Sequence, residues 1–375
     1  MEPVVADLAS LVAFDTVSDR PVNDLAAWLA NRCENLGFRI EKFPDPNHPG
    51  KGTLIASRGP ADTEGLVLSG HMDVVPTEGQ PWSTDPFQLT EKDGKLYGRG
   101  SADMKGFFAA TLQALARVPA TDLTRQVMLV WTHDEEIGCL GSAHLADALS
   151  STGRRLPSAC LIGEPTDFQI LHQHPGHVAV KIEVEGLAAH SSRPQLGVNA
   201  IEGAMRVIQA IHEVSAQIES GCPEGTESPW VPINVARIEG GSAINIVPDR
   251  CVIHLGYRPP PGMHAHHVFE QISNVLEQAA QQAKVTATLL RVSPSLLTRL
   301  GTPLQRALSS HVRNAHVGTA TFATDGGNLA RLGCEPLIFG PGSIEVAHKA
   351  DEFVETADLV RAIDVIESVI RRMAG

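Results

Sequence analysis

The sequence predicts an α/β protein whose main domain has three layers around a mainly parallel central sheet, with a two-layer α+β domain inserted into it. Apolar strands without alternation predict the parallel sheet, because strands covered on both faces lack a polar face. From residue 177 the predicted strands alternate between apolar and polar residues, and after residue 302 the pattern of the N-terminal part of the chain returns. A chain of 375 residues also exceeds the size at which single cores stop growing. We therefore expect a main domain formed by residues 1–174 and 295–375, interrupted by an inserted domain at 175–294.

The strand predicted at 127–131 is the most informative element, because it runs into three consecutive acids. Asp134, Glu135 and Glu136 follow its C-terminal edge, where ligands and catalytic groups collect in open α/β sheets. Adjacent side chains leaving a strand point in different directions, so Glu135 and Glu136 are expected to differ in task, one binding metal and the other handling a proton. A solvated acidic turn that begins the next helix is the alternative.

Two more predicted strands end on metal-competent side chains. The strand at 66–68 leads into His71 and Asp73, and the strand at 159–162 leads into Glu164. The His-x-Asp spacing places both side chains on one side of extended backbone, which would let Asp73 orient a metal-bound His71 ring. A structural histidine is the alternative reading of His71.

Two loops supply the remaining candidates. Asp103 lies in the glycine-rich segment 98–106 before a helix, where it is either a ligand or an N-cap, and His348 lies in the segment 340–351. The glycines match neither the dinucleotide fingerprint nor the phosphate-loop ending. With His71, Glu136 and Glu164, these residues give two imidazoles and three carboxylates, which suit a pair of divalent ions with open coordination positions. Asp103 is the expected bridge between the ions, and Glu135 is left as general base.

The remaining patterns complete the two domains. In the main domain, helices are predicted at 4–14, 22–36, 107–115, 142–149, 304–314 and 356–373, and further strands at 39–43, 53–57 and 336–339. Asn23 or Asp24 is the expected N-cap of the second helix. The inserted domain reads as β-α-β-β-α-β, with strands at 178–185, 233–238, 250–257 and 285–290 and helices at 199–214 and 267–283.

Composition restricts the choice of partners. The net charge is −13 and long Lys or Arg runs are absent from the sequence, so neither nucleic acid nor a membrane surface is an expected partner. Without a basic segment followed by an apolar one, the expected location is cytoplasmic. Six cysteines are scattered singly and are expected to be reduced and mostly buried, although Cys139 could in principle be a nucleophile. The histidines at 172, 174 and 177 are not expected to bind metal, and those at 264, 266 and 267 are expected in a solvated loop.

Five segments together resemble the dinuclear-zinc metallopeptidase and deacetylase family that contains acetylornithine deacetylase, succinyl-diaminopimelate desuccinylase, aminoacylase and glutamate carboxypeptidase. They are Ser69-Gly-His71-Met-Asp73-Val-Val-Pro76, Gly98-Arg-Gly-Ser-Ala-Asp103-Met-Lys-Gly106, Asp134-Glu135-Glu136-Ile-Gly138, Gly163-Glu164-Pro-Thr166 and Ala347-His348-Lys-Ala-Asp351. The resemblance covers nearly the whole chain, and five segments in the right order make it highly specific.

The resemblance implies a role for each matching residue. His71 and Glu164 would bind one ion, Glu136 and His348 the other, and Asp103 both, with zinc expected and cobalt or manganese as alternatives. Glu135 would be the acid/base, Asp73 would support His71, and the peptide bond after Asp103 would be cis. The inserted domain would form a homodimer and supply His190, which stabilises the oxyanion in the partner's site. Substrate-binding positions are implied for Arg258, Asn245, Thr324, Gly326 and Gly327.

The activity that the resemblance implies is hydrolysis of the amide bond of an N-acyl amino acid. The stretch from Trp131 to Gly141 with Gly163-Glu-Pro-Thr166 is most similar to acetylornithine deacetylases of arginine biosynthesis, so N-acetyl-L-ornithine is the expected substrate. Pro175 stands where such deacetylases usually carry Lys, which leaves the acyl amino acid open. Desuccinylase, N-acetylcitrulline deacetylase and general aminoacylase or dipeptidase are the alternatives. A binding homologue without activity is a different class, which a complete set of five ligand positions disfavours.

Overall fold

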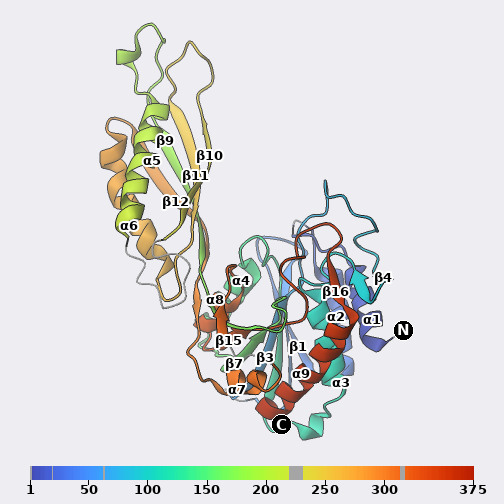
Figure 1. The fold of residues 1–375 in the computed structure, drawn as a ribbon. Coiled ribbons are helices and arrows are strands. Elements are labelled where there is room, and N and C mark those ends of the chain that lie inside the picture. Colours follow the sequence, from blue (N-terminus) through green and yellow to red (C-terminus); the bar gives the residue numbers. More distant parts are fainter. Residues whose placement is uncertain (1, 19, 62–63, 219–230, 313–316) are drawn as a thin grey trace. The chain divides into compact units, whose positions relative to one another are not determined.

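The structure, a computed structural model, describes residues 2–18, 20–61, 64–218, 231–312 and 317–375 (Figure 1). The chain divides into two compact units. The first unit comprises Met1–Gln173, Thr298–Ala320 and Thr324–Gly375, and the second comprises His174–Leu297 and Thr321–Ala323.

The first unit is built on one large sheet with a parallel centre. Its strands follow the order β1 (Arg39–Pro44), β2 (Gly52–Arg58), β6 (Gln126–Thr132), β3 (Gly65–His71), β7 (Ala159–Ile162), β15 (Glu335–Ile338) and β8 (Ile170–His174), and β14 (Val317–Thr319) also pairs with β8. The central strands β6, β3, β7 and β15 run parallel, whereas β1 and β2 form an antiparallel edge. The predicted mainly parallel sheet is confirmed.

Helices cover both faces of this sheet, which makes three layers. One hydrophobic core joins the sheet to α1 (Pro3–Val12), α2 (Asn23–Asn35), α3 (Lys105–Ala116), α7 (Pro303–Ser309) and α9 (Thr356–Ala374). It contains Leu66 and Leu68 of β3 but not the equally buried Val67 between them, as expected where alternate side chains point to opposite faces. The pair α4 (Leu140–Ser151) and α8 (Gly326–Arg331) packs against β2 and β15. Each fully buried leucine contributes about 1.5–3 kcal/mol, so this two-sided burial fixes the strand ends firmly.

Short elements complete the first unit. A small antiparallel sheet has the order β16 (Phe353–Glu355), β5 (Lys95–Tyr97) and β4 (Thr90–Lys92), and a 3₁₀ turn, η1, covers Ala120–Asp122. Strand β16 follows the segment with His348, and β5 precedes the segment with Asp103. Their pairing therefore brings together two segments that lie far apart in the sequence.

The second unit has the predicted order β-α-β-β-α-β. Its elements are β9 (His177–Glu185), α5 (Ala200–Gln217), β10 (Ile233–Gly240), β11 (Arg250–Tyr257), α6 (Ala265–Ala280) and β12 (Lys284–Ser293), with η2 (Pro194–Leu196) and β13 (Leu296–Leu297) as short additions. The four long strands form an antiparallel sheet in the order β10-β11-β9-β12. On β9, alternate residues from Val178 to Val184 are fully buried in a core shared with both helices, and the residues between them are half-buried. This alternation matches the half-exposed strand that the sequence predicts.

Three local predictions differ from the structure. Helix α2 has Val22 as its N-cap, so neither Asn23 nor Asp24 caps it. The three histidines expected in a solvated loop instead begin α6, where His264 is the N-cap and its ring accepts a hydrogen bond from the His266 N–H at 3.4 Å. Helix α7 ends at Ser309, well before the predicted end at residue 314, which lies outside the described residues.

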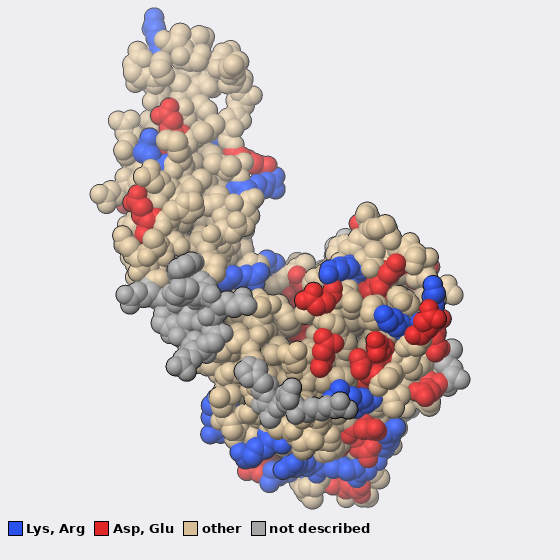
Figure 2. Space-filling model, in the orientation of Figure 1, with Lys and Arg blue, Asp and Glu red and all other residues tan. Residues whose placement is uncertain are grey.

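The described cysteines and the surface agree with the composition. Five cysteines are free and buried, and Cys222 lies outside the described residues. Figure 2 shows acidic and basic side chains interspersed on the visible face of the first unit, without a uniformly basic area. Among the described helices, none combines the length and the apolarity needed to cross a membrane.

Candidate metal centre

Three neighbouring strands of the central sheet deliver candidate ligands to one edge. Strand β3 lies between β6 and β7, and the three end at or just before His71, Glu136 and Glu164 respectively. His71 Nε2 lies 3.9 Å from Glu164 Oε1, and the side chains of all three candidate ligands are at least nine-tenths buried. The carboxyl edge of the sheet thus holds the cluster that the strand patterns predict.

Asp103 lies between the two histidines. Its Oδ1 is 3.0 Å from His71 Nε2, and its Oδ2 is 3.2 Å from His348 Nε2. His348 Nε2 is also 3.0 Å from Glu136 Oε2. The peptide bond between Asp103 and Met104 is cis, and α3 begins only after the N-cap Met104, so Asp103 does not cap that helix. Each carboxylate oxygen faces a different imidazole, which is the geometry that a bridging ligand needs.

Asp73 holds the acidic turn rather than the His71 ring. Its Oδ1 accepts a hydrogen bond from the Glu135 N–H at 3.0 Å, and its Oδ2 accepts bonds from the Glu136 N–H at 3.2 Å and from Ser18 Oγ at 2.8 Å. His71 Nδ1 bonds instead to the main-chain oxygen of Asp73 at 2.8 Å and lies 3.7 Å from the carboxylate. The prediction that this carboxylate orients the ring therefore differs from the structure, because two adjacent backbone N–H groups satisfy it.

The acidic segment is not a solvated helix start. Asp134 is 1% exposed and forms an ion pair with Lys51, whose Nζ lies 2.7 Å from Asp134 Oδ1. Helix α4 begins at Leu140, after the three acids, with Cys139 as its N-cap. Cys139 is buried, and its Sγ lies 3.5 Å from Glu135 Oε1. The turn is thus held from both sides, by Asp73 and by Lys51.

Glu352 is a supporting residue that the sequence analysis missed. Its Oε1 accepts hydrogen bonds from the N–H groups of Ala102 and Asp103, both at 3.0 Å, and its Oε2 lies 2.6 Å from Arg99 Nη1. Both side chains of this ion pair are 1% exposed. Glu352 therefore fixes the backbone that carries the Asp103 carboxylate. An acid four residues after His348 was the available signal, but only tertiary structure reveals its partners.

The electrostatics of the cluster call for positive charge. Burial raises the pKa of Glu135 and of Glu164 well above the usual range and that of Glu136 to about 7, and neighbouring carboxylates add to each rise. Hydrogen bonds to Asp103 and Glu136 raise the pKa of His348 to about 10. Burial opposes ionisation of Asp103, but bonds from His348 and His71 hold its pKa below the usual range. Divalent cations would satisfy these carboxylates without protons, so the donor set fits a pair of metal ions.

The predicted substrate loop begins α8 in the first unit. Thr324, Gly326 and Gly327 are all buried, and Thr324 Oγ1 accepts a hydrogen bond from the Gly326 N–H at 3.0 Å. The adjacent Asp325 accepts a bond from Thr132 Oγ1 at 2.5 Å, which ties this loop to the end of β6. The structure thus places the loop beside the strand that carries the acidic turn.

The other predicted site residues belong to the second unit. His190 is exposed, its Nδ1 lies 2.8 Å from Ser192 Oγ, and the Ser191 N–H donates to the main-chain oxygen of Asn245 at 3.0 Å. Asn245 therefore lies next to the His190 loop. Arg258 lines a hollow of the same unit together with three other cationic or titratable side chains, namely His177, His254 and Arg291. Within this unit, the structure brings His190 and Asn245 together.

A comparison with known families identifies the chain. The model of peptidase family M20/M25/M40 matches residues 67–372. The chain belongs to this family. Membership in M20 indicates a metal-dependent hydrolase, and the ligand cluster of His71, Asp103 and Glu136, whose donor atoms lie within 4.8 Å of one another, agrees with it.

Solved structures share the M20 fold over the whole chain. An M20 metallo-carboxypeptidase from Sulfolobus solfataricus has a TM-score of 0.78 at 19% identity and covers 99% of both chains. A tripeptidase from Staphylococcus aureus has a TM-score of 0.76 at 21% identity, covering 99% of this chain and 97% of its own. A dinuclear metal-binding M20 peptidase from Bacillus subtilis has a TM-score of 0.70 at 14% identity, covering 98% of this chain and 96% of its own. At these identities the likeness shows the fold, including the inserted unit.

Proposed function

We propose that this M20 protein hydrolyses the amide bond of an N-acyl amino acid, with N-acetyl-L-ornithine, cleaved to L-ornithine and acetate, as the first candidate. The observation that supports hydrolysis most is the position of Asp103, whose two oxygens face two imidazoles 3.0 and 3.2 Å away. A single zinc ion takes four ligands and would not need five protein side chains. The arrangement favours a dinuclear centre.

The contacts support the ligand assignment that the family resemblance implies. His71 and Glu164 would hold one ion, Glu136 and His348 the other, and Asp103 would bridge them. Zinc is the first candidate because imidazole and carboxylate suit it, and cobalt and manganese accept the same donors. When bound, such a pair lowers the pKa of a water toward ~7 and polarises a carbonyl.

The side chains of the chain supply proton transfer and orientation. Glu135 is half-buried and its pKa is raised by desolvation, so it can take a proton from the attacking water and return it to the leaving amine. Asp73 holds the backbone of Glu135 at 3.0 Å and thereby fixes its position. His190 would donate to the developing oxyanion and Asn245 would orient the substrate beside it. Arg258 would bind the α-carboxylate, for which a guanidinium offers paired donors.

Peptide substrates are the second candidate. The fold neighbours include the tripeptidase and human carnosine dipeptidase 1, which has a TM-score of 0.71 at 18% identity and covers 99% of this chain and 96% of its own. The segment His174-Pro175-Gly176 lacks the lysine usual in deacetylases, and burial lowers the pKa of His174 to about 4, so neither residue supplies that charge. N-succinyl-diaminopimelate and N-acetylcitrulline complete the substrates to be tested. A binding protein without activity is disfavoured, because all five ligand positions are filled.

We also propose a homodimer formed through the second unit and a cytoplasmic location. The exposed position of His190 supports the dimer, since an oxyanion donor that serves another subunit has to be accessible. Sedimentation equilibrium of the intact chain tests the dimer directly.

The experiment that tests the function is a substrate panel with metal-free enzyme. Zinc or cobalt is added back, and hydrolysis of N-acetyl-L-ornithine, N-acetyl-L-citrulline, N-succinyl-L,L-diaminopimelate and dipeptides is followed. Glu135→Gln should lower kcat by about 10²–10⁴-fold and leave the metal content unchanged. Glu277→Gln, the same change on the exposed face of α6, is the matched control and should keep full activity. Metal-dependent cleavage of dipeptides alone would refute the acyl amino acid substrate, and a protein that binds no metal would refute the centre.

A further inference from the structure

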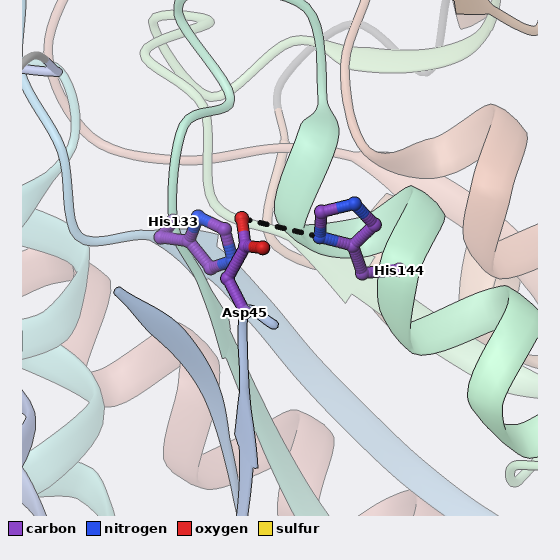
Figure 3. A group of neighbouring side chains, drawn as sticks. All are labelled: Asp45, His133 and His144. Atoms are coloured by element: carbon purple, nitrogen blue, oxygen red, sulfur yellow. Dashed lines mark ion pairs between the residues drawn. The ribbon is translucent and has the colours of Figure 1, made fainter. Parts of the chain in front are cut away.

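A second group of metal-competent side chains lies outside the proposed centre. Asp45, His133 and His144 offer donor atoms that all lie within 4.8 Å of one another (Figure 3). Asp45 follows β1, His133 follows β6, and His144 lies in the second turn of α4, so three separate segments meet here. Figure 3 shows the Asp45 carboxylate between the two rings, with its Oδ2 at 3.4 Å from His144 Nδ1.

His133 is the unusual member of this group. Its side chain is 1% exposed, and its Nδ1 lies 3.4 Å from Asp134 Oδ2, but within the described part of the chain neither ring nitrogen has a hydrogen bond of normal geometry. His144 Nδ1 is likewise buried and without one. Leaving a buried polar group unsatisfied costs about 1–3 kcal/mol, so two such rings aimed at one carboxylate need an explanation. A bound cation would satisfy both.

The surroundings match those of a histidine-rich metal site. Asp45 Oδ2 is also 2.9 Å from Nδ1 of His48, an exposed side chain that lies outside this group and would have to turn toward it to complete the ligand set. His133 Nδ1 lies 3.4 Å from Asp134 Oδ2. A proton on Nδ1 would face this carboxylate and leave Nε2 unprotonated and able to bind a metal, which is how carboxylates orient metal-bound histidines. Lys51 neutralises Asp134 at 2.7 Å. Tetrahedral zinc ligands lie about 3.3 Å apart, so small side-chain movements would close the site.

The alternative is a polar cluster held by hydrogen bonds alone. The Asp45 carboxylate already accepts from the Asn47 N–H at 2.8 Å and pairs with His48, so Asp45 does not require a metal. His133 is different, because neither of its ring nitrogens forms a hydrogen bond of normal geometry in the described part of the chain. The buried His133 ring and the buried Nδ1 of the partly exposed His144, rather than the carboxylate, favour the metal.

We propose that Asp45, His133 and His144, with His48 as fourth ligand, bind a zinc-class divalent cation that is distinct from the ions of the hydrolytic centre. The two sites share no residue. The cation would be structural: it would join the β1–β2 loop to the end of β6 and to α4, on both sides of the turn that carries Glu135 and Glu136. Three histidines and one carboxylate suit zinc, and a closed ligand set is typical of structural sites.

The test is the zinc content of the full-length protein. Metal-free protein is dialysed against buffered zinc, and zinc per chain is measured by mass spectrometry for the wild type, Asp45→Asn, His144→Gln and His212→Gln. His212 is exposed on α5 and controls for loss of any histidine. Each of the first two variants should bind one zinc fewer per chain than the wild type, whereas His212→Gln should bind the same amount.

The result does not depend on the hydrolytic centre. His348→Gln should bind the ions of the hydrolytic centre more weakly but retain the additional zinc. The double variant His348→Gln with His144→Gln should therefore again bind one zinc fewer per chain than His348→Gln alone. Cobalt in place of zinc provides a second measurement, because the visible spectrum of a tetrahedral histidine site should disappear in His144→Gln. Equal zinc content and identical cobalt spectra in folded wild type and His144→Gln, with circular dichroism as the check of folding, would overturn the proposal.

Discussion

Replacing Glu352 should weaken both the fold and the metal centre. Three hydrogen bonds end on this carboxylate, from the N–H groups of Ala102 and Asp103 at 3.0 Å and from Arg99 at 2.6 Å. Burial raises the pKa of Glu352 even though Arg99 opposes the rise, so the ion pair itself adds little net stability. Removing one partner is costly all the same, because the other charge stays buried without compensation.

The expected loss can be worked out from the partners that remain. Breaking a buried pair costs about 3–5 kcal/mol. Glu352→Gln keeps an oxygen for the two N–H groups, and Arg99 retains Gln80 Oε1 at 2.5 Å, so about 3 kcal/mol is expected. Glu352→Ala removes every bond and should lose about 5 kcal/mol. Because the Asp103 backbone is no longer held, metal affinity should fall about 10–100-fold.

Two measurements check this reasoning. Urea unfolding of the metal-free protein, followed by circular dichroism, gives the change in free energy of unfolding. Competition with a chelator gives the change in metal affinity. Glu345→Gln, the same substitution at an exposed position of the same segment, should change stability by less than about 0.5 kcal/mol. If Glu352→Gln were as stable as this control and bound metal as tightly as the wild type, the role assigned to Glu352 would be wrong.

Three further predictions concern other contacts. Asp73→Asn turns an amide N–H toward one of two backbone N–H groups, so kcat should fall at least tenfold and the protein should lose about 2–3 kcal/mol, measured by steady-state kinetics and urea unfolding. Gly163→Ala would place a Cβ 1.9 Å from Cγ of the Phe107 ring, which should cost about 3 kcal/mol in urea unfolding, and a variant as stable as the wild type would contradict the packing. Glu41→Gln removes a half-exposed pair in which a bond from Arg154 lowers the carboxyl pKa, so at most about 0.5 kcal/mol should be lost at pH 7. Since the folded pKa is the lower one, this difference should disappear as the pH falls below 4.5, and a constant difference down to pH 2 would refute it.

Local sequence patterns predicted the parts of the site that strands deliver. Apolar runs predicted β3, β6 and β7, and polar residues at or within a few positions of the end of each run pointed to the candidate ligands His71, Glu136 and Glu164. Such predictions are possible because a strand and the first residues of its loop are close in the chain. The β-α-β-β-α-β order of the second unit was predictable for the same reason, since each element carries its own period.

Contacts between distant segments could not be predicted in this way. The sequence shows Glu352 only as an acid after His348, and nothing local indicates that it binds the backbone before α3. Asp73 has the spacing of a histidine-orienting residue, but its carboxylate meets the acidic turn once β3 and β6 pair. The three histidines at the start of α6 resemble a polar loop in the sequence, because the apolar stripe of the helix becomes regular only from Val268. Contacts of this kind are made by residues of other elements, which the local sequence does not show.

The placement of the second unit within the chain has a consequence for biosynthesis. Roughly 180 residues separate Glu164 from His348, so at ~5–20 residues per second a ribosome needs about 10–40 s between them. During that interval β15 has not yet joined β7, and neither His348 nor Glu352 can reach Asp103. During this time the carboxylates after β6 and β7 therefore lack the imidazole of His348. Metal loading of a newly made chain is thus a late event, which follows the return of the segment from Thr298 onward to the first sheet.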